Sequence, residues 1–405
     1  MSELARRAGL TPRAVSVEVA RLDAAGLVTV EAIGPAHVVR PRTEHPAFGP
    51  LRALLGAASP SDADRDDEAV RQSLAAHGAP LLGEMASRPL PLGEALVRGI
   101  ALARTDAQVL LVLPALLARR AGEIDWAALE EAARRQKLKA ELGFLIDLTA
   151  EVVGLPALRS RAAGLGDARR RLQRYLPATS RPYERRLAGL RSPPCAARWN
   201  FQVNIPEGAF RAACEQGPPA TPGQLSEAFV ALDRGLAEAV TVTLVGGAAL
   251  ALLHPGRQAP ASIELASVEG LGFDRARELL RPHLPPGLEP RLAPEPVAPA
   301  EWRYRRLSAG PPGLGSLRVL VPERHDAALM CVASGLAHDL QAAEALHRAA
   351  PLRLGVLLSR YFEVDPDQVP DPEALRLSFL ALVERLFGRE TATRTDSGLR
   401  GAARS

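Results

Sequence analysis

The sequence predicts an α+β protein of several domains, with a helix–turn–helix and β-hairpin first, an all-α middle, and an α/β carboxy-terminal half. Three observations support this prediction. The 405 residues exceed the roughly 100–200 residues of one ordinary domain. Residues 69–154 repeat apolar side chains at the spacing typical of helices. Strand-like runs of β-branched residues alternate with helical stretches after residue 240 and close to the amino terminus.

The composition argues against several classes of protein. The longest apolar run, residues 109–118, contains Pro114 and is shorter than the ~20 residues needed to cross a bilayer. No apolar segment follows Met1, so no signal peptide is expected. The three cysteines are far apart, without the spacing of a disulfide framework or a cysteine zinc site. We therefore expect a cytoplasmic protein with no membrane partner and no bound metal.

Residues 1–55 show the pattern of a helix–turn–helix followed by a β-hairpin. Val15, Val19 and Leu22 recur at helical spacing on the inner face of a second helix. Thr11 is a favourable N-cap for this helix, and Pro12 a favourable first residue. A winged helix–turn–helix has this geometry and places its second helix in the major groove. The residues expected to face DNA are Thr11, Arg13, Ser16, Val17 and Arg21, with His37 in the wing.

The string ELARRAGLTPRAVSVEVARLDAAGLV resembles the ArsR/MarR-like winged-helix regulators over about residues 2–42. This resemblance implies binding of double-stranded DNA, with residues 12–23 as the recognition helix and residues 33–37 as the wing. Such regulators usually form homodimers. The helix that normally precedes Ser2 is missing, and Val17, Glu18 and Ala20 occupy positions that often carry basic or polar readers. Docking to a protein partner is therefore the alternative to DNA binding, which we favour.

An acidic stretch at 59–68, SPSDADRDDE, indicates a linker into a helical domain that we place at 69–216. Leu129, Leu138 and Leu145 lie on one helical repeat, and Gly154 predicts a helix end. Residues 96–154 resemble the helical part of antitoxin regulators of the abortive-infection AbiE type. This resemblance implies contact with a partner, and the segment contains no catalytic motif.

The most basic segment of the chain lies at 159–198. It has eleven arginines against two acidic residues, a net charge of +9 in a chain whose total is +4. Tyr175, Tyr183 and Trp199 lie among these arginines, as in proteins that stack nucleic-acid bases. A solvated surface and a docking surface for an acidic partner are two alternatives. We favour a patch that contacts phosphates, formed by Arg169, Arg170, Arg171 and Arg174.

A hinge rich in proline and glycine at 217–224 precedes the α/β half, which we place at 224–388. A helix at 224–238 leads to a β-branched strand at 240–245, the pair Gly246-Gly247, a helix of small residues and a short strand at 262–266. This order is that of a minimal nucleotidyltransferase. There, glycines let the backbone approach a triphosphate, and two carboxylates on the second strand hold two Mg²⁺ ions. Further strands are expected at 304–307 and 317–321, and further helices near 273–283, 324–349 and 372–388.

Residues 242–388 resemble an uncharacterised nucleotidyltransferase-like family related to the AbiE toxin. The strings LVGGAALALL, GRQAPASIELA and PERHDAALMCVASGLAHDLQAAEAL carry the resemblance. Ser262 and Glu264 stand where the paired aspartates belong, and Cys331 and Leu336 replace a lysine and an arginine. The resemblance implies a vestigial site made of Gly246, Gly247, Ser262, Glu264, Asp326 and Asp339.

These departures favour a nucleotidyltransferase-like fold that has lost catalysis, because one carboxylate is a poor holder for two Mg²⁺ ions. The alternative is an enzyme that uses Mg²⁺ and a nucleotide through Glu264 and another carboxylate, such as Glu289. Helix capping is a further interpretation of the pairs His325/Asp326 and His338/Asp339.

The sequence thus predicts a winged helix, an all-α middle, a nucleotidyltransferase-like α/β domain and a disordered tail at 389–405. We expect a DNA-binding transcriptional regulator whose inactive domain senses a ligand or binds a partner, with no cofactor. The alternative is a toxin-type nucleotidyltransferase of a toxin–antitoxin system, fused to its own regulator.

Overall fold

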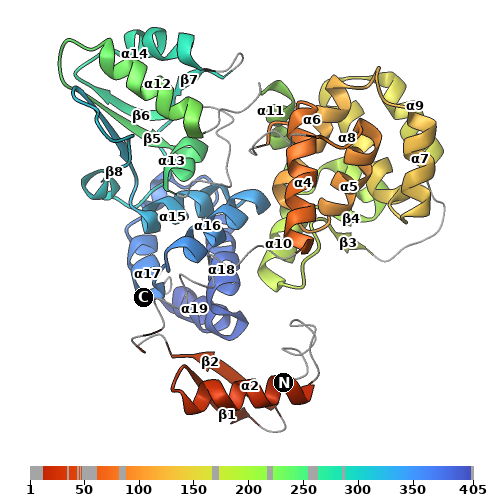
Figure 1. The fold of residues 1–405 in the computed structure, drawn as a ribbon, viewed down its shortest axis with the longest axis horizontal. Helices are drawn as coiled ribbons and strands as arrows, with labels where there is room; N and C mark the ends of the chain where they lie inside the picture. The colour runs from red at the N-terminus through yellow and green to blue at the C-terminus, as the bar shows by residue number, and fades with distance from the viewer. Residues whose placement is uncertain are drawn as a thin grey trace. The chain divides into compact units, whose positions relative to one another are not determined.

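In a computed structural model the chain forms two compact units, residues 1–65 and residues 66–405 (Figure 1). Helices and strands occur in both units, which confirms the prediction of a mixed α and β protein. The residues that the structure describes are 12–33, 36–42, 45, 47, 62–81, 88–166, 173–216, 222–253, 263–284 and 288–402.

The described part of the amino-terminal unit is one helix and a β-hairpin. Helix α2 spans Pro12–Ala24, and strands β1 (Val28–Ile33) and β2 (Ala36–Pro41) pair antiparallel. Val15 and Val19 are buried against the hairpin, as their four-residue spacing predicts. Leu22 is instead 40% exposed, because the apolar cluster of this unit forms around the two valines. The predicted first helix lies outside the described residues.

The described residues between 62 and 165 are mostly helical. The helices are α4 (Asp62–Ala76), α5 (Leu92–Leu102), α6 (Ala107–Arg119), α7 (Trp126–Arg135), α8 (Lys139–Val153) and α9 (Pro156–Leu165). The predicted helix end at Gly154 is confirmed, since this glycine closes α8 with a φ of 72°. The prediction of a linker at 59–68 is wrong from Asp62 onward, because α4 begins at that residue. Carboxylates in a first turn are favoured by the helix dipole.

Shorter elements follow between residues 174 and 215. They are β3 (Arg174–Tyr175), α10 (Pro182–Arg191), the 3₁₀ helix η1 (Pro194–Trp199), β4 (Phe201–Gln202) and α11 (Glu207–Glu215). Strands β3 and β4 pair in parallel, and Phe201 of β4 packs against Phe144 of α8. The short strands therefore belong to the same core as the long helices.

A five-stranded mixed sheet lies at the centre of the carboxy-terminal half, in the order β7-β6-β5-β9-β8. Its strands are β5 (Val240–Val245), β6 (Ile263–Glu269), β7 (Pro290–Leu292), β8 (Leu307–Ser308) and β9 (Leu317–Val321). The central strand β5 is almost entirely buried and pairs antiparallel with β6 and parallel with β9. The strands expected at 240–245 and 317–321 are confirmed. The strand expected at 304–307 is wrong at residues 304 and 305, which belong to the 3₁₀ helix η3 (Trp302–Arg305). Leu307, its last expected residue, begins β8.

Helices pack around this sheet and extend beyond it (Figure 1). Around the sheet lie α12 (Pro222–Arg234), α13 (Gly246–Leu253) and α14 (Phe273–Leu280), the last continued by the 3₁₀ helix η2 (Arg281–His283). Beyond it lie α15 (Arg324–Ser334), α16 (Ala337–Ala349), α17 (Leu354–Phe362), the 3₁₀ helix η4 (Pro366–Gln368), α18 (Pro372–Phe387) and α19 (Arg389–Ala402). Across the described ranges, no helix has both the length and the apolar character needed to span a membrane.

The segment predicted as a disordered tail forms a helix, α19, as far as Ala402. Ala392 and Leu399, one heptad apart, are buried in the same core as α18. Asp396 of α19 forms an ion pair with Arg376 of α18. The polar composition is misleading here, because two small apolar contacts and one ion pair suffice to dock a helix whose other faces are solvated.

The helical middle and the carboxy-terminal half belong to one compact unit. Tyr183 and Leu187 of α10 are buried in the core formed by α15–α19, although they precede the expected hinge at 217–224. Conversely, Ala337 of α16 is buried in the core of the helical middle. The two segments that the sequence suggests as separate domains therefore share apolar surface.

The docking of α19 predicts a cost for truncating its buried leucine. Leu399→Ala should lower the free energy of unfolding by about 2–3 kcal/mol, because Leu399 is 7% exposed and its removal leaves a cavity. Urea denaturation followed by circular dichroism measures this change. The control Leu190→Ala removes a side chain that is 63% exposed and should cost less than about 0.5 kcal/mol. Equal costs for the two variants would show that α19 is not docked.

Candidate functional site

One face of α2 carries most of the residues predicted to read DNA. Arg13, Ser16, Val17 and Arg21 are all exposed, while Val15 and Val19 on the opposite face are buried. Arg21 forms an ion pair with Glu18 at 2.7 Å, so part of its charge is neutralised within the helix. His37 lies in β2, at the start of the second hairpin strand. Thr11 lies outside the described residues.

A second candidate site forms where β5 turns into α13. Gly246 adopts φ of +61°, a conformation that glycine tolerates and L residues rarely adopt. Glu264 of β6 pairs with Val245 across the sheet, and its Oε2 atom lies 2.3 Å from the position a Cβ atom would take at residue 246. The backbone conformation therefore favours glycine at residue 246, and a larger residue there would displace the Glu264 carboxylate. The sequence predicts that Gly246 and Gly247 let the backbone approach a triphosphate. In the structure, the group that lies closest to Gly246 is the Glu264 carboxylate.

Gly246, Gly247 and Glu264 open into a cleft of about 460 Å³. Asp339 lines the same cleft, so the structure brings four of the six predicted vestigial residues together. Gln108 and Leu111 of α6 also line it, which makes the helical middle one wall of the cleft. No feature of the sequence near residues 108–111 indicates this role, because the contact joins segments more than 130 positions apart. Ser262 lies outside the described residues.

The polar groups on the helical side of the cleft are mostly engaged with one another. The Ser334 hydroxyl lies within hydrogen-bond distance of the Asp339 carboxylate and of the Cys331 carbonyl oxygen, and its single proton can be donated to either. Burial, together with the nearby charge of Asp339, raises the pKa of the Cys331 thiol well above its ordinary value. Cys331 therefore stays a protonated thiol, which is a weak nucleophile and a weak metal ligand.

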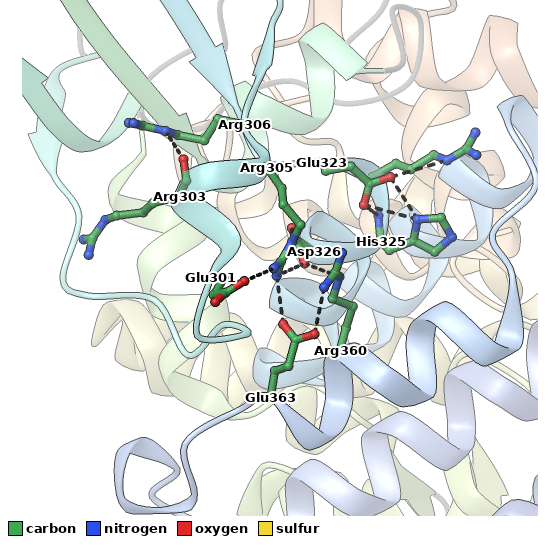
Figure 2. A network of polar contacts seen from close by, with 10 residues as sticks. Glu301, Arg303, Arg305, Arg306, Glu323, His325, Asp326, Arg360 and Glu363 are labelled. Carbon is green, nitrogen blue, oxygen red and sulfur yellow. Dashed lines mark hydrogen bonds and ion pairs between the residues drawn. The ribbon is translucent and has the colours of Figure 1, made fainter.

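Asp326, a predicted member of the vestigial site, lies elsewhere. Its carboxylate is fully buried and accepts two hydrogen bonds from Arg305, at 2.9 and 3.0 Å. Arg360 lies 3.5 Å from the same carboxylate, and Glu363 bridges the two guanidinium groups (Figure 2). This cluster joins η3 to α15 and α17. Asp326 therefore does not line the cleft with the other predicted vestigial residues, because both of its oxygens are committed to this ion cluster.

The sequence also suggests that the pairs His325/Asp326 and His338/Asp339 cap helices, and the structure corrects this interpretation. Glu323 caps α15, accepting a hydrogen bond from the His325 backbone amide, and Leu336 precedes α16 without a side-chain cap. His325 is buried; its Nδ1 lies 2.9 Å from Glu323, and its Nε2 accepts a hydrogen bond from the Arg353 backbone amide. Burial raises the pKa of Glu323, but the hydrogen bonds from His325 outweigh burial and lower it overall. These residues therefore hold α15 to the start of α17.

The proposed fit of two Mg²⁺ ions is not supported by the described residues. With Asp326 in the ion cluster, Glu264 and Asp339 are the carboxylates that line the cleft within the described ranges. Those ranges contain no group of three or more His, Cys, Asp or Glu side chains placed to hold a metal ion. Glu289, suggested as a second ligand, pairs with Arg281 at 3.3 Å and does not line the cleft.

Several described arginines of the basic patch expected at 159–198 form contacts inside the fold. Arg174 pairs with the buried Glu141 at 3.1 Å and stacks over Phe201, so part of its charge is neutralised within the protein. Arg198 likewise pairs with Asp147. Two of the three aromatic residues, Tyr183 and Trp199, are buried and cannot stack on bases. Arg169, Arg170 and Arg171 lie outside the described residues.

Comparisons of the chain with protein-family models, curated proteins and solved structures found no match. The geometry described above is therefore the basis for what we propose about function.

The buried ion cluster predicts a large effect of one neutralising substitution. Asp326→Asn should lower the free energy of unfolding by about 3 kcal/mol, because it leaves two partly buried guanidinium groups with Glu363 as their shared carboxylate. Thermal and urea denaturation measure this change. The control Glu301→Gln neutralises a carboxylate that is 76% exposed and 3.9 Å from Arg305, and should cost less than about 0.5 kcal/mol. A neutral effect of Asp326→Asn would contradict the structural role assigned to the cluster.

Proposed function

We propose that the protein is a DNA-binding regulator whose amino-terminal unit reads double-stranded DNA through α2. The observation that carries this proposal is the two-sided character of α2. Its valines are buried on the β-hairpin, while Arg13, Ser16, Val17 and Arg21 form an exposed face. An exposed face with two arginines and a serine offers donors for base edges and phosphates, and Val17 offers an apolar contact for a thymine methyl group.

The proposed mode of binding is that of a winged helix. The recognition helix enters the major groove and the β1–β2 hairpin contacts the adjacent backbone. Arg21 is paired with Glu18, so Arg13 is the stronger candidate for a bidentate contact with guanine. The modest excess of arginines over acidic residues in this unit implies few phosphate contacts and a shallow dependence on salt.

We further propose that the carboxy-terminal half binds a partner or ligand without catalysing a reaction. Three features of this half support the proposal. Asp326 is engaged in a structural ion cluster, the Cys331 thiol is held protonated, and the helix that would carry triphosphate-binding cations presents Cys331 to the cleft. The cleft keeps room for a ligand, at about 460 Å³.

DNA reading by α2 predicts a specific effect of one substitution. Arg13→Ala should weaken binding to the operator by about 1–3 kcal/mol and reduce the preference over unrelated DNA. Gel-shift titrations against the region upstream of the protein's own gene measure both quantities. The control Arg88→Ala removes an exposed arginine of the second unit and should leave binding unchanged. Equal effects of the two substitutions, or none, would end the proposal.

A toxin-type nucleotidyltransferase is the second candidate function. It is favoured by the close contact of Gly246 with Glu264 and by the presence of Asp339 in the same cleft. Under our proposal, the purified protein incorporates no labelled nucleotide into RNA or protein in the presence of Mg²⁺. Incorporation that disappears in Glu264→Ala and persists in the control Glu289→Ala would instead establish the enzyme.

A further inference from the structure

A groove of about 560 Å³ lies between helices α5 and α7 of the helical middle. Cavities of this size commonly hold small molecules. We call it the α5–α7 groove. It is separate from the cleft at Gly246, since the two cavities share no lining residue. Its apolar lining residues are Leu92 and Val97 of α5, Ile124, and Ala128, Leu129 and Ala132 of α7.

Small residues keep the α5–α7 groove open. A Cβ atom at Gly93, in the first turn of α5, would meet open space, and Ala128 is exposed. Val97, Ile124 and Leu129 are buried and form the floor of the groove. An apolar ligand would release the water that covers this carbon surface, which favours its binding.

Most charged side chains in the lining have partners within the protein. Glu94 pairs with Arg98 at 2.8 Å. Glu123 pairs with Arg120, which lies outside the lining, also at 2.8 Å. Asp125 caps α7 by accepting a hydrogen bond from a backbone amide of its first turn. These four lining residues therefore have little charge left for a ligand.

Arg135 is the exception among the charged residues of the groove. It is exposed in the last turn of α7, and across the described ranges its guanidinium group forms no hydrogen bond or ion pair. Asp125 and Arg135 are separated by ten residues of α7, or ~15 Å along the helix. The groove therefore has an acidic residue at one end and an unpaired cation at the other.

The sequence around Arg135 strengthens the positive charge at this end. Residues 134–139, RRQKLK, contain four basic residues and no acidic one, and their two lysines are the only lysines of the chain. A surface of this sign raises the local concentration of anions. Gln136 lines the groove next to Arg135 and carries an amide donor.

We propose that the α5–α7 groove binds a small carboxylic acid with an apolar body, of the type of a medium-chain fatty acid. The hydrocarbon part lies on the apolar floor, and the carboxylate binds Arg135, whose parallel N–H groups match its two oxygens. Nucleic acids and polyphosphates fit poorly, because most of the lining offers them only carbon. This site is independent of DNA binding by α2.

The test is isothermal titration calorimetry of the full-length protein with sodium decanoate, below the concentration at which it forms micelles. Decanoate should bind at least about tenfold more tightly than decylammonium, which has the same chain length and the opposite charge. Arg135→Gln should weaken decanoate binding about three- to tenfold and narrow the difference between the two probes. A merely structural role of Arg135 would leave this preference for the anion unchanged.

The matched control for charge is Arg134→Gln, on the neighbouring residue of the same helical turn. Arg134 does not line the groove, and its guanidinium group lies 3.6 Å from Glu130 and 3.5 Å from Glu131. This substitution should alter the affinity for decanoate by less than about twofold.

Filling the groove tests where the hydrocarbon part binds. Ala128→Phe should weaken decanoate binding about tenfold or more, because the ring occupies the groove. The control Ala127→Phe places the same ring on an exposed residue of α7 that does not line the groove, and should change the affinity by less than about twofold. Unfolding midpoints confirm that all four variants are folded.

Absence of decanoate binding to the unsubstituted protein would overturn the proposal. Equal affinities for decanoate and decylammonium would do the same. Equal effects of Arg134→Gln and Arg135→Gln, or of Ala127→Phe and Ala128→Phe, would place the ligand elsewhere and also overturn it. None of these results bears on DNA binding by α2, which Arg13→Ala tests separately.

Discussion

The carboxy-terminal half depends on one buried carboxylate. Asp326 is fully buried and is stable as a charge because Arg305 binds both of its oxygens and Arg360 lies beside them. Buried charges persist in proteins when they are paired and hydrogen-bonded in this way. The pair also joins η3, which leads to the edge of the sheet, to the helices α15 and α17 (Figure 2). Removing this carboxylate would leave both guanidinium groups with Glu363 as their shared partner.

A second buried ion cluster joins the helical middle to helices α16 and α18. Arg385 of α18 binds Glu184 of α10 and Glu344 of α16, next to the apolar residues Tyr183 and Leu187. Helix α10 therefore belongs by packing to the carboxy-terminal core and by sequence to the helical middle. This arrangement places α16 beside the beginning of α6, where the Gln341 side chain accepts a hydrogen bond from the Ala107 backbone amide and donates one to the Thr105 carbonyl oxygen.

The two proposals assign separate tasks to the two units. The amino-terminal unit presents an exposed, partly basic helix face, and the second unit presents the cleft at Gly246. A protein that binds DNA through one surface and a ligand or partner through another would couple the presence of that ligand or partner to the occupancy of an operator. The glycine at residue 246 leaves room for the Glu264 carboxylate in this cleft.

The sequence by itself determined the local elements of this protein. Val15 and Val19 predict the buried face of α2, the β-branched run at 240–245 predicts the central strand, and Gly154 predicts the end of α8. In each case the signal lies within a few consecutive residues, since periodicity and backbone conformation are local properties. Only the tertiary structure decided that Asp326 and Arg174 serve internal ion pairs, that residues 389–402 form a docked helix, and that Gln108 faces the cleft. These features depend on which charged and apolar groups meet across more than twenty positions of sequence, and the pattern of neighbouring residues carries no information about such partners.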